Sequence, residues 1–131
     1  MFYPRSQPRK PAVTKAQTGA AMESAALEWL QAQGLTCIER NFRCRGGEID
    51  LIMCAQHTLI FVEVRLRNHG EFGSAAESVT RAKQRRIIHA AQFYLATRAS
   101  SQQTCRFDVL AAREEGNVII WDWVQDAFYA G

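Results

Sequence analysis

Apolar and polar positions along the chain predict two helices, because apolar residues recur there at intervals of three and four. The first helix is expected over residues 18–33 and the second over residues 80–97. Thr18 and Thr80 precede the two apolar stripes and are expected to cap them, since a threonine hydroxyl can accept a hydrogen bond from a free backbone amide. The apolar faces expected to cover the core are Met22, Ala26, Trp29 and Leu30 in the first helix and Ile87, Ile88, Ala91, Tyr94 and Leu95 in the second.

Five other segments are rich in apolar, β-branched and aromatic residues, and these predict strands. The segments are residues 35–40, 48–54, 58–67, 105–112 and 118–124. Only a short link joins the second and third strands, so they are expected to form an antiparallel hairpin. Alternation predicts the two faces of the second strand: Ile49, Leu51 and Met53 against Glu48, Asp50 and Ile52. The order of helices and strands predicts an α/β fold with a mixed sheet.

Length and composition point to a single globular domain. The chain has 131 residues, of which 47% are hydrophobic and 22% charged. Residues 1–16 contain all three prolines and several cations, so we expect a disordered basic tail before a domain over residues 17–131. No apolar run is long enough to span a membrane, and no secretory signal is present. We therefore expect a cytoplasmic protein that contacts no membrane.

The cysteines and the charges add further expectations. The four cysteines lack metal-ligand spacing and are expected to be free thiols: Cys37, Cys44, Cys54 and Cys105. Residues 1–22 contain four cations and no acid. Because their positive charge exceeds the net charge of +3, the remaining chain is slightly acidic. Local clusters such as "RAKQRR" at residues 81–86 can still contact phosphates. A solvated charged face is an equally good interpretation of any one cluster.

Asp50 and Glu63 are acids in apolar strands that are expected to pair. If their side chains face the same side, their oxygens converge beside Arg65, which shares the face of Glu63. Such a pair can hold Mg²⁺, which uses one or two carboxylates together with waters and substrate phosphate. The alternative is that both acids pair with arginines in a structural network or lie on an exposed face. His57, in the hairpin turn beside this site, could touch substrate, but a solvent-facing turn histidine is the favoured interpretation.

Trp29, Trp121 and Trp123 have two interpretations. They can stack on nucleic-acid bases. Their positions on a helix stripe and on one strand face favour packing in the core.

The strings "GGEIDLI" and "FVEVR" resemble the signature of the PD-(D/E)XK nuclease superfamily, in which an acid on one strand precedes E-x-K on the next. Longer pieces are similar to the YraN-like family of uncharacterised bacterial proteins, which is similar to archaeal Holliday junction resolvases. These pieces include "TGAAMESAALEWLQAQG", "NFRCRGGEIDLI", "FGSAAESVTRAKQRRI" and "CRFDVL". The resemblance implies a restriction-endonuclease-like αβββαβ core, with helices flanking a mixed central sheet.

The resemblance also implies roles for individual residues. Asp50 and Glu63 would be the ligands of Mg²⁺ or Mn²⁺, and Glu23 matches an acid on the first helix. Arg65 stands where the signature has lysine. Arginine keeps the charge and binds phosphate, but it stays protonated and cannot accept a proton from water. The predicted catalytic residues are therefore Glu23, Asp50, Glu63 and Arg65, with Arg65 as the departure from the family pattern.

The same resemblance also implies a function. It implies a metal-dependent endonuclease, an endodeoxyribonuclease that hydrolyses phosphodiester bonds in branched or structured DNA. Nucleic-acid contacts are expected from Lys83, Gln84 and Arg85 on the second helix, and resolvase-like cutting of two strands implies a homodimer. One alternative is a catalytically weak or inactive nucleic-acid-binding protein of the same fold, which Arg65 favours. Another is a protein-interaction scaffold with a vestigial site.

Overall fold

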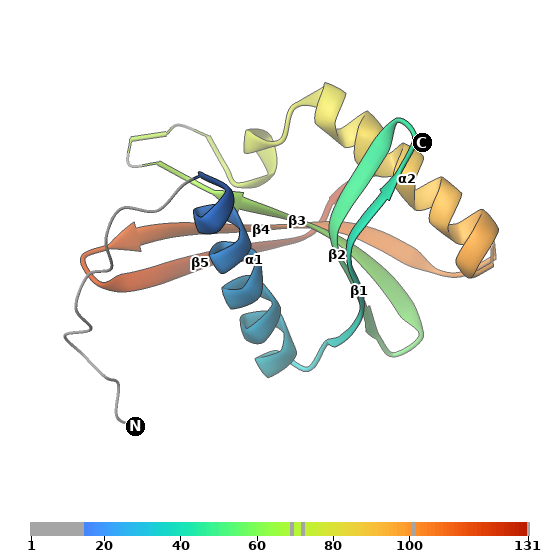
Figure 1. The fold of residues 1–131 in the computed structure, drawn as a ribbon, viewed down its shortest axis with the longest axis horizontal. Helices are drawn as coiled ribbons and strands as arrows, with labels where there is room; N and C mark the ends of the chain where they lie inside the picture. Colours follow the sequence, from blue (N-terminus) through green and yellow to red (C-terminus); the bar gives the residue numbers. More distant parts are fainter. Residues whose placement is uncertain (1–14, 69, 72, 101, 131) are drawn as a thin grey trace.

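The computed structural model describes residues 15–68, 70–71, 73–100 and 102–130 (Figure 1). The elements, in chain order, are α1 (Lys15–Ala32), β1 (Thr36–Cys44), β2 (Gly47–Ala55), β3 (Thr58–Leu66), the short 3₁₀ helix η1 (Ala76–Ser78), α2 (Arg81–Arg98), β4 (Cys105–Glu115) and β5 (Val118–Phe128). This order confirms the predicted α/β class and is consistent with a restriction-endonuclease-like core. Residues 1–14, most of the predicted tail, lie outside the described residues.

Within the described residues, one five-stranded sheet forms the middle layer, with its strands in sequence order from β1 to β5. Neighbouring strands are antiparallel except β3 and β4, which run parallel. Parallel neighbours need a long crossover connection, and α2 supplies it. The helices α1 and α2 cover opposite faces of this mixed sheet (Figure 1).

An apolar cluster on each face holds a helix against the sheet. The α1 cluster contains Ala26 and Leu30, which pack on Leu51, Ile60 and Val62. The α2 cluster contains four buried residues of that helix, namely Ile87, Ala90, Ala91 and Tyr94. Burial of one stripe per helix supplies most of the stability of helices of this length. These clusters confirm the predicted face of the second helix and, apart from Met22, that of the first.

Trp29 of α1 packs against Trp121 and Trp123 of β5. The rings of Trp29 and Trp121 are stacked, with centroids 5.8 Å apart, and Trp123 meets Trp29 edge-on at 5.8 Å. All three are partly buried against the α1 cluster. Aromatic contacts of this kind add to the stabilisation from burial. The interpretation of the tryptophans as packing residues is therefore confirmed.

Several element ends differ from the sequence-based expectations. The helix α1 begins at Lys15, so the prediction that Thr18 caps it is wrong. Thr80 does cap α2, since its Oγ1 accepts a 3.1 Å hydrogen bond from the backbone amide of Lys83. The strands β1 and β5 continue about four residues past their predicted ends. Pairing with a neighbouring strand extends these strands over polar residues. Local strand propensity does not include this pairing, so it does not predict the extension.

The strands β2 and β3 separate at one end of their ladder, and this separation positions the candidate site. Their last paired residues are Leu51 and Val62, although β2 keeps pairing with β1 beyond this point and β3 with β4. The β1–β2 hairpin bends toward α2, while β3, β4 and β5 continue together (Figure 1). Asp50 and Glu63 are the first residues beyond the last pair.

The bend also changes the direction in which β2 faces. Ile49 and Ile52 pack in the α2 cluster, whereas Leu51 and Met53 pack in the α1 cluster. The prediction that Ile49, Leu51 and Met53 share one face is therefore wrong. The alternation breaks at Asp50, where β2 leaves β3 and turns toward α2. A period of two describes only a regular strand, so the sequence pattern does not show this break.

The predicted β2–β3 hairpin is present, but its turn lies far from Asp50 and Glu63. Gln56 and His57 have positive φ angles of 50° and 71°. Such angles let a two-residue turn match the twist of the strands that it joins. Five residues of strand separate the turn from Asp50, which corresponds to about 17 Å. His57 therefore does not lie beside the site, and its exposed position confirms the interpretation as a solvent-facing turn histidine.

Asp108 is a fully buried acid that joins β4 to the end of β5. Its carboxylate accepts hydrogen bonds of 2.9 and 3.1 Å from Nε and Nη2 of Arg106. It also accepts 2.9 Å hydrogen bonds from Nε1 of Trp123 and from the backbone amide of Asp126. Four donors satisfy both oxygens, so the charge is compensated inside the sheet.

Two smaller expectations concern thiols and membranes. Cys37, Cys44, Cys54 and Cys105 all carry free thiols, as predicted. In the part of the chain that the structure describes, neither helix combines the length and apolar character that crossing a membrane requires.

Candidate active site

Asp50 lies on β2 where that strand leaves β3. Its Oδ2 accepts a 2.8 Å hydrogen bond from the backbone amide of Val64 on β3. This amide lies beyond the last β2–β3 pair, so the carboxylate takes the place of a missing strand partner. The hydrogen bond orients the Asp50 carboxyl group toward β3 and fixes one of its oxygens.

Glu63 is only 5% exposed, and its carboxyl group lies within hydrogen-bonding reach of Asp50. Burial raises the pKa of Glu63 to about 8, and the charge of Asp50 contributes to the shift in the same direction. Burial also raises the pKa of Asp50, although the hydrogen bond from Val64 opposes that shift. Near neutral pH the two carboxyl groups therefore share a proton, which a bound cation would displace.

Oε1 of Glu63 differs from the other carboxylate oxygens of the sheet in its surroundings. It is buried, and no group among the described residues donates a hydrogen bond to it. Burying a carboxylate oxygen without a donor is costly, so such atoms are rare unless a ligand or an ion completes their surroundings. Asp108, in the same sheet, has four donors and needs no such partner.

Two cations flank the carboxyl pair from different elements. Nζ of Lys83, in the first turn of α2, is 3.9 Å from Oε2 of Glu63 and 4.0 Å from Oε1 of Glu48. Arg65 shares the face of Glu63 on β3, and its charge acts to lower the pKa of Glu63. Nε of Arg65 is buried and meets no hydrogen-bond acceptor in the described structure. A phosphate at this position would find two cations beside two carboxyl groups.

The helix α1 brings a third acid to the edge of the site. Burial raises the pKa of Glu23, and the nearby charge of Asp50 raises it further. A hydrogen bond from the side chain of Asn41 opposes both effects. The register on either side of Asn41 places it opposite Asp50, on β1. Glu23, Asn41, Asp50 and Glu63 therefore come from four consecutive elements and meet in one region.

Of the three residues predicted to contact nucleic acid, Lys83 reaches the carboxyl pair, whereas Gln84 and Arg85 do not. Lys83 points toward the sheet and reaches Glu63. Nε2 of Gln84 donates a 3.1 Å hydrogen bond to the carbonyl oxygen of Val79, so this amide tightens the start of α2. Arg85 is exposed and lies about 200° around the helix from Lys83, which directs it away from the carboxyl pair.

Sequence reasoning missed two polar residues of the site. Glu48 contacts Lys83 and also accepts a 3.0 Å hydrogen bond from Nη2 of Arg86. The available signal was its place two residues before Asp50 in the same strand. Asn41 has a φ of 53°, which asparagine tolerates better than most residues. No hydrophobic pattern reveals that conformation, so nothing in the alternation of β1 pointed to Asn41.

The carboxyl pair fits Mg²⁺ or Mn²⁺ better than a metal that needs a complete protein cage. Among the described residues, no group of three or more His, Cys, Asp and Glu side chains could hold a metal ion. Mg²⁺ prefers oxygen ligands and commonly uses one or two carboxylates, with solvent and substrate phosphate completing its shell. Oε1 of Glu63 and the adjoining carboxyl group of Asp50 offer such oxygens. The expected ligand set is therefore Asp50 and Glu63.

Comparisons with known proteins place the chain among bacterial relatives. Residues 22–112 match the model of the family described as "Uncharacterised protein family UPF0102". A UPF0102 protein from Alcanivorax borkumensis is 47% identical over 119 residues, covering 89% of this chain and 95% of its own length. One from Cupriavidus metallidurans is 49% identical over 125 residues, with 95% and 90% covered. The UPF0102 protein YraN of Salmonella newport is 51% identical over 118 residues, with 88% and 87% covered. The chain therefore belongs to the UPF0102 family, as its resemblance to YraN-like proteins predicted.

Proposed function

We propose that this protein is a metal-dependent endonuclease that hydrolyses phosphodiester bonds in branched or structured DNA. The observation that carries the proposal is the buried Oε1 of Glu63, which accepts no hydrogen bond and lies beside Asp50. A strained carboxyl pair of this kind is a common feature of functional sites. The αβββαβ order of the PD-(D/E)XK nucleases supports the reaction class, and the resemblance to resolvases supports a branched substrate.

Asp50 and Glu63 would hold Mg²⁺ or Mn²⁺. When bound, the ion supplies Lewis-acid stabilisation of the charge that develops on the phosphoryl oxygens. The chain itself contributes a fixed geometry, because the Val64 amide holds Asp50 and the sheet holds Glu63. Groups held in place before the substrate arrives need no costly reorganisation during the reaction.

The cations of the site have a separate role in binding phosphate. Arg65 presents a guanidinium whose buried Nε meets no acceptor, so a phosphate oxygen can satisfy it. Lys83 offers a second positive charge from α2, 3.9 Å from Glu63. Because Arg65 stays protonated, it binds and orients the phosphate and accepts no proton from the attacking water. Glu23 lies near Asp50 and brings a third carboxyl group to the site.

A cleavage assay tests this proposal. The native protein is incubated in Mg²⁺ and Mn²⁺ with a four-way junction, a flap, a duplex, single-stranded DNA and RNA. We expect metal-dependent cuts that favour the branched DNAs. Asp50→Asn and Glu63→Gln keep the shapes of their side chains and should each lower the rate by at least about 100-fold, as expected for loss of a metal ligand or a key transition-state contact.

The matched control is Glu28→Gln, which alters an exposed acid on α1 and should cut like the native protein. Equal cutting by the native protein and both carboxyl variants would refute the proposed site. It would identify any observed activity as a contaminant or as the work of another part of the chain.

One observation favours a second function, a nucleic-acid-binding protein with weak or no catalysis. Arg65 replaces the signature lysine, and an always-protonated side chain removes one route for moving a proton. This alternative predicts salt-sensitive binding that survives Asp50→Asn and Glu63→Gln, without cleavage in any metal. Arg65→Lys separates the two functions, because it restores the signature residue and should raise cleavage only where an active metal site exists.

A further inference from the structure

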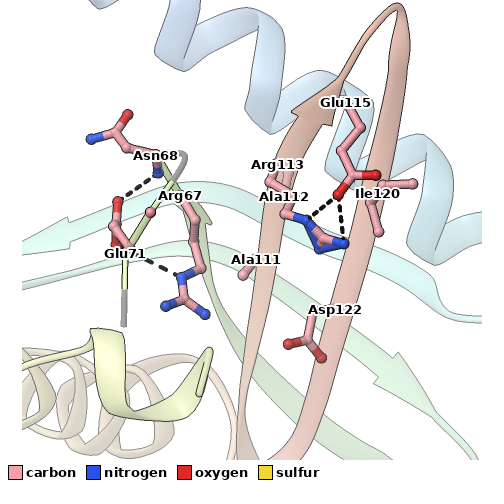
Figure 2. Close-up of a pocket in the computed structure, with 10 residues that line it drawn as sticks. Arg67, Asn68, Glu71, Ala111, Ala112, Arg113, Glu115, Ile120 and Asp122 are labelled. Carbon is pink, nitrogen blue, oxygen red and sulfur yellow. Dashed lines mark hydrogen bonds and ion pairs between the residues drawn. The ribbon is translucent and has the colours of Figure 1, made fainter. Parts of the chain in front are cut away.

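A hollow of about 300 Å³ lies between the segment that follows β3 and the strands β4 and β5 (Figure 2). Arg67 forms one wall of the hollow and follows Glu63 and Arg65 along one face of β3. Ala111 of β4 pairs with Arg65 of β3 on one side and with Asp122 of β5 on the other. The hollow therefore starts next to the candidate site and extends across β4 to β5.

The lining of the hollow combines an apolar floor with a polar edge. Ala111, 1% exposed, and Ile120 supply apolar surface. Asp122 contributes an exposed carboxylate from β5, and Asn68 lies on the opposite wall. Figure 2 shows Arg67 and Asp122 on either side of Ala111. The hollow therefore offers apolar and polar surface together, which suits a ligand with flat apolar faces and polar edges.

Two arginines stand at the rim, each held by an acid. Nε of Arg67 is 3.7 Å from Oε1 of Glu71, and its Nη2 donates a 3.0 Å hydrogen bond to the carbonyl oxygen of Gly73. Arg113 contacts Glu115 at 2.8 Å (Figure 2). Arg67 is the more firmly placed of the two, because it has two partners and its side chain is only 13% exposed, whereas the Arg113 pair is exposed. A held guanidinium plane offers a surface on which a flat aromatic ligand can stack.

We propose that this hollow, here called the base pocket, receives an unpaired nucleobase of the nucleic-acid strand bound at Asp50 and Glu63. The residues that line the base pocket include Arg67, Asn68, Ala111, Arg113, Ile120 and Asp122, and the acids Glu71 and Glu115 also line it. This inference rests on the proposed function, because it assumes that a phosphate occupies the carboxyl pair. A nucleobase matches the lining, since its faces are apolar and its edges carry donors and acceptors.

Distance supports the connection between the two sites. Asp122 is two strands and two residues away from Glu63, which corresponds to about 12 Å. Stacked B-DNA rises about 3.4 Å per nucleotide along one strand, so this gap spans no more than about four nucleotides. Arg65 and Arg67 lie on the face between the two sites and can follow the intervening phosphates. One strand can therefore reach both places.

The base pocket restricts the class of substrate. A base paired inside a duplex cannot enter a hollow in the protein surface without leaving its stack. Unpaired bases at flaps, bulges and junction branch points enter at lower cost. The Asp122 carboxylate accepts hydrogen bonds, so it favours bases that present amino groups, such as cytosine and adenine, over thymine. The expected ligand is an unpaired stretch directly beside the cut.

A binding experiment tests the base pocket without relying on cleavage. Flap DNAs carry either an intact four-nucleotide unpaired arm or the same arm made of abasic residues, and binding is measured by fluorescence anisotropy in Ca²⁺. The native protein should bind the abasic flap at least about fivefold more weakly, as expected for loss of one stacked base. Asp122→Asn and Ile120→Trp should bind both flaps alike, near the level of the abasic flap.

Glu114→Gln is the matched control, because it lies on the same β-hairpin with its side chain on the opposite face. It should discriminate between the flaps as the native protein does. Equal binding of both flaps by the native protein, or discrimination retained in Asp122→Asn and Ile120→Trp, overturns the base pocket. Discrimination without cleavage in Mg²⁺ or Mn²⁺ supports the base pocket and overturns only the nuclease function. Failure to bind any of these DNAs overturns both.

Discussion

Asp108 and Glu63 are two buried acids in one sheet whose surroundings differ in one respect. Asp108 accepts four hydrogen bonds and is 0% exposed, so its charge is fully compensated. Glu63 has one ion pair, at 3.9 Å to Lys83, and an oxygen that accepts no hydrogen bond among the described residues. The first arrangement stabilises the fold. The second lowers stability in return for a site that a cation can complete.

The raised pKa of Glu63 predicts how stability depends on pH. Burial raises the pKa of Glu63 to about 8, above its ordinary value of 4.5, so the folded state holds a proton that the unfolded state loses. Stability should therefore fall as pH rises from about 5 toward 8. Glu63→Gln removes this loss and should raise the free energy of unfolding at pH 8 by on the order of 1–3 kcal/mol. Urea denaturation at pH 5 and pH 8, without divalent metal, measures the effect.

Glu28→Gln provides the comparison for that measurement, since Glu28 is exposed on α1. Its stability should follow the native pH dependence. A Glu63→Gln protein that is less stable than the native one at pH 8 would show that Glu63 stabilises the fold as an ion pair with Lys83. That result would favour the structural-network interpretation of the two acids.

For individual residues, the sequence predicted the acids and cations of the site but not the polar residues that contact them. Asp50, Glu63 and Arg65 were predicted because charged residues stand out in apolar strands. Glu48 and Asn41 were missed, since their roles depend on contacts with Lys83 and Glu23 that arise only when separate elements meet. The position of Lys83 was predictable, because helical periodicity aligned it with Ile87 toward the sheet.

The packing of α2 against the β1–β2 hairpin depends on a close approach between Gly47 and the helix backbone. A Cβ atom added at Gly47 would lie 2.3 Å from the carbonyl oxygen of Arg86 and 3.0 Å from Cβ of Ala90. Only glycine permits this contact, since no other residue lacks the Cβ atom. The approach brings α2 against the end of β2, and Lys83 and Glu48 meet as a consequence.

Gly47→Ala should therefore separate α2 from β2. The added methyl group has no space, so we expect destabilisation of about 1–3 kcal/mol, the usual cost of overpacking a core. Chemical denaturation measures this loss. Gly19→Ala is a suitable comparison, because a Cβ atom there would meet nothing within 4 Å. Equal stability of Gly47→Ala and the native protein would show that the helix can shift without cost.

Asp108 supports a different prediction, for β4 and β5. Asp108→Ala leaves Arg106 and Trp123 without their acceptor and opens a gap in the sheet. Loss of one partner from a buried charged network costs about 3–5 kcal/mol. Thermal unfolding should show a correspondingly large decrease in melting temperature. A decrease as small as that of an exposed-site substitution would mean that solvent replaces the lost acceptor.

For the whole molecule, the sequence predicted the order of elements and the hairpin better than the shape of the sheet. Alternation and helical stripes are local signals, so they revealed α1, α2 and β1–β5. The separation of β2 from β3 at Asp50 is a tertiary feature, because it follows from packing of the β1–β2 hairpin against α2. The candidate site depends on that separation, which explains why its outline was predictable and its geometry was not.

Cations near the carboxyl pair predict salt-dependent binding of DNA. Arg43 is exposed on β1 and lies near enough to Glu23 to lower its pKa. Arg43→Gln should weaken junction binding and reduce the slope of log K against log salt by about 0.7–0.9, the value for one phosphate contact. Arg98→Gln, at the far end of α2, should leave the slope unchanged. A slope reduced equally by both changes would indicate a diffuse electrostatic attraction instead of a defined path.

Calorimetric titration with Mn²⁺ measures whether Asp50 and Glu63 form a divalent-metal site. The native protein should bind the ion and release protons on binding. Its affinity should rise from pH 6 to pH 8, because the shared proton must leave and the pKa of Glu63 is raised to about 8. Asp50→Asn and Glu63→Gln should abolish the binding, whereas Glu28→Gln should retain it. Mn²⁺ binding that is unchanged in both carboxyl variants, or absent from the native protein at pH 8, would exclude a metal site at Asp50 and Glu63.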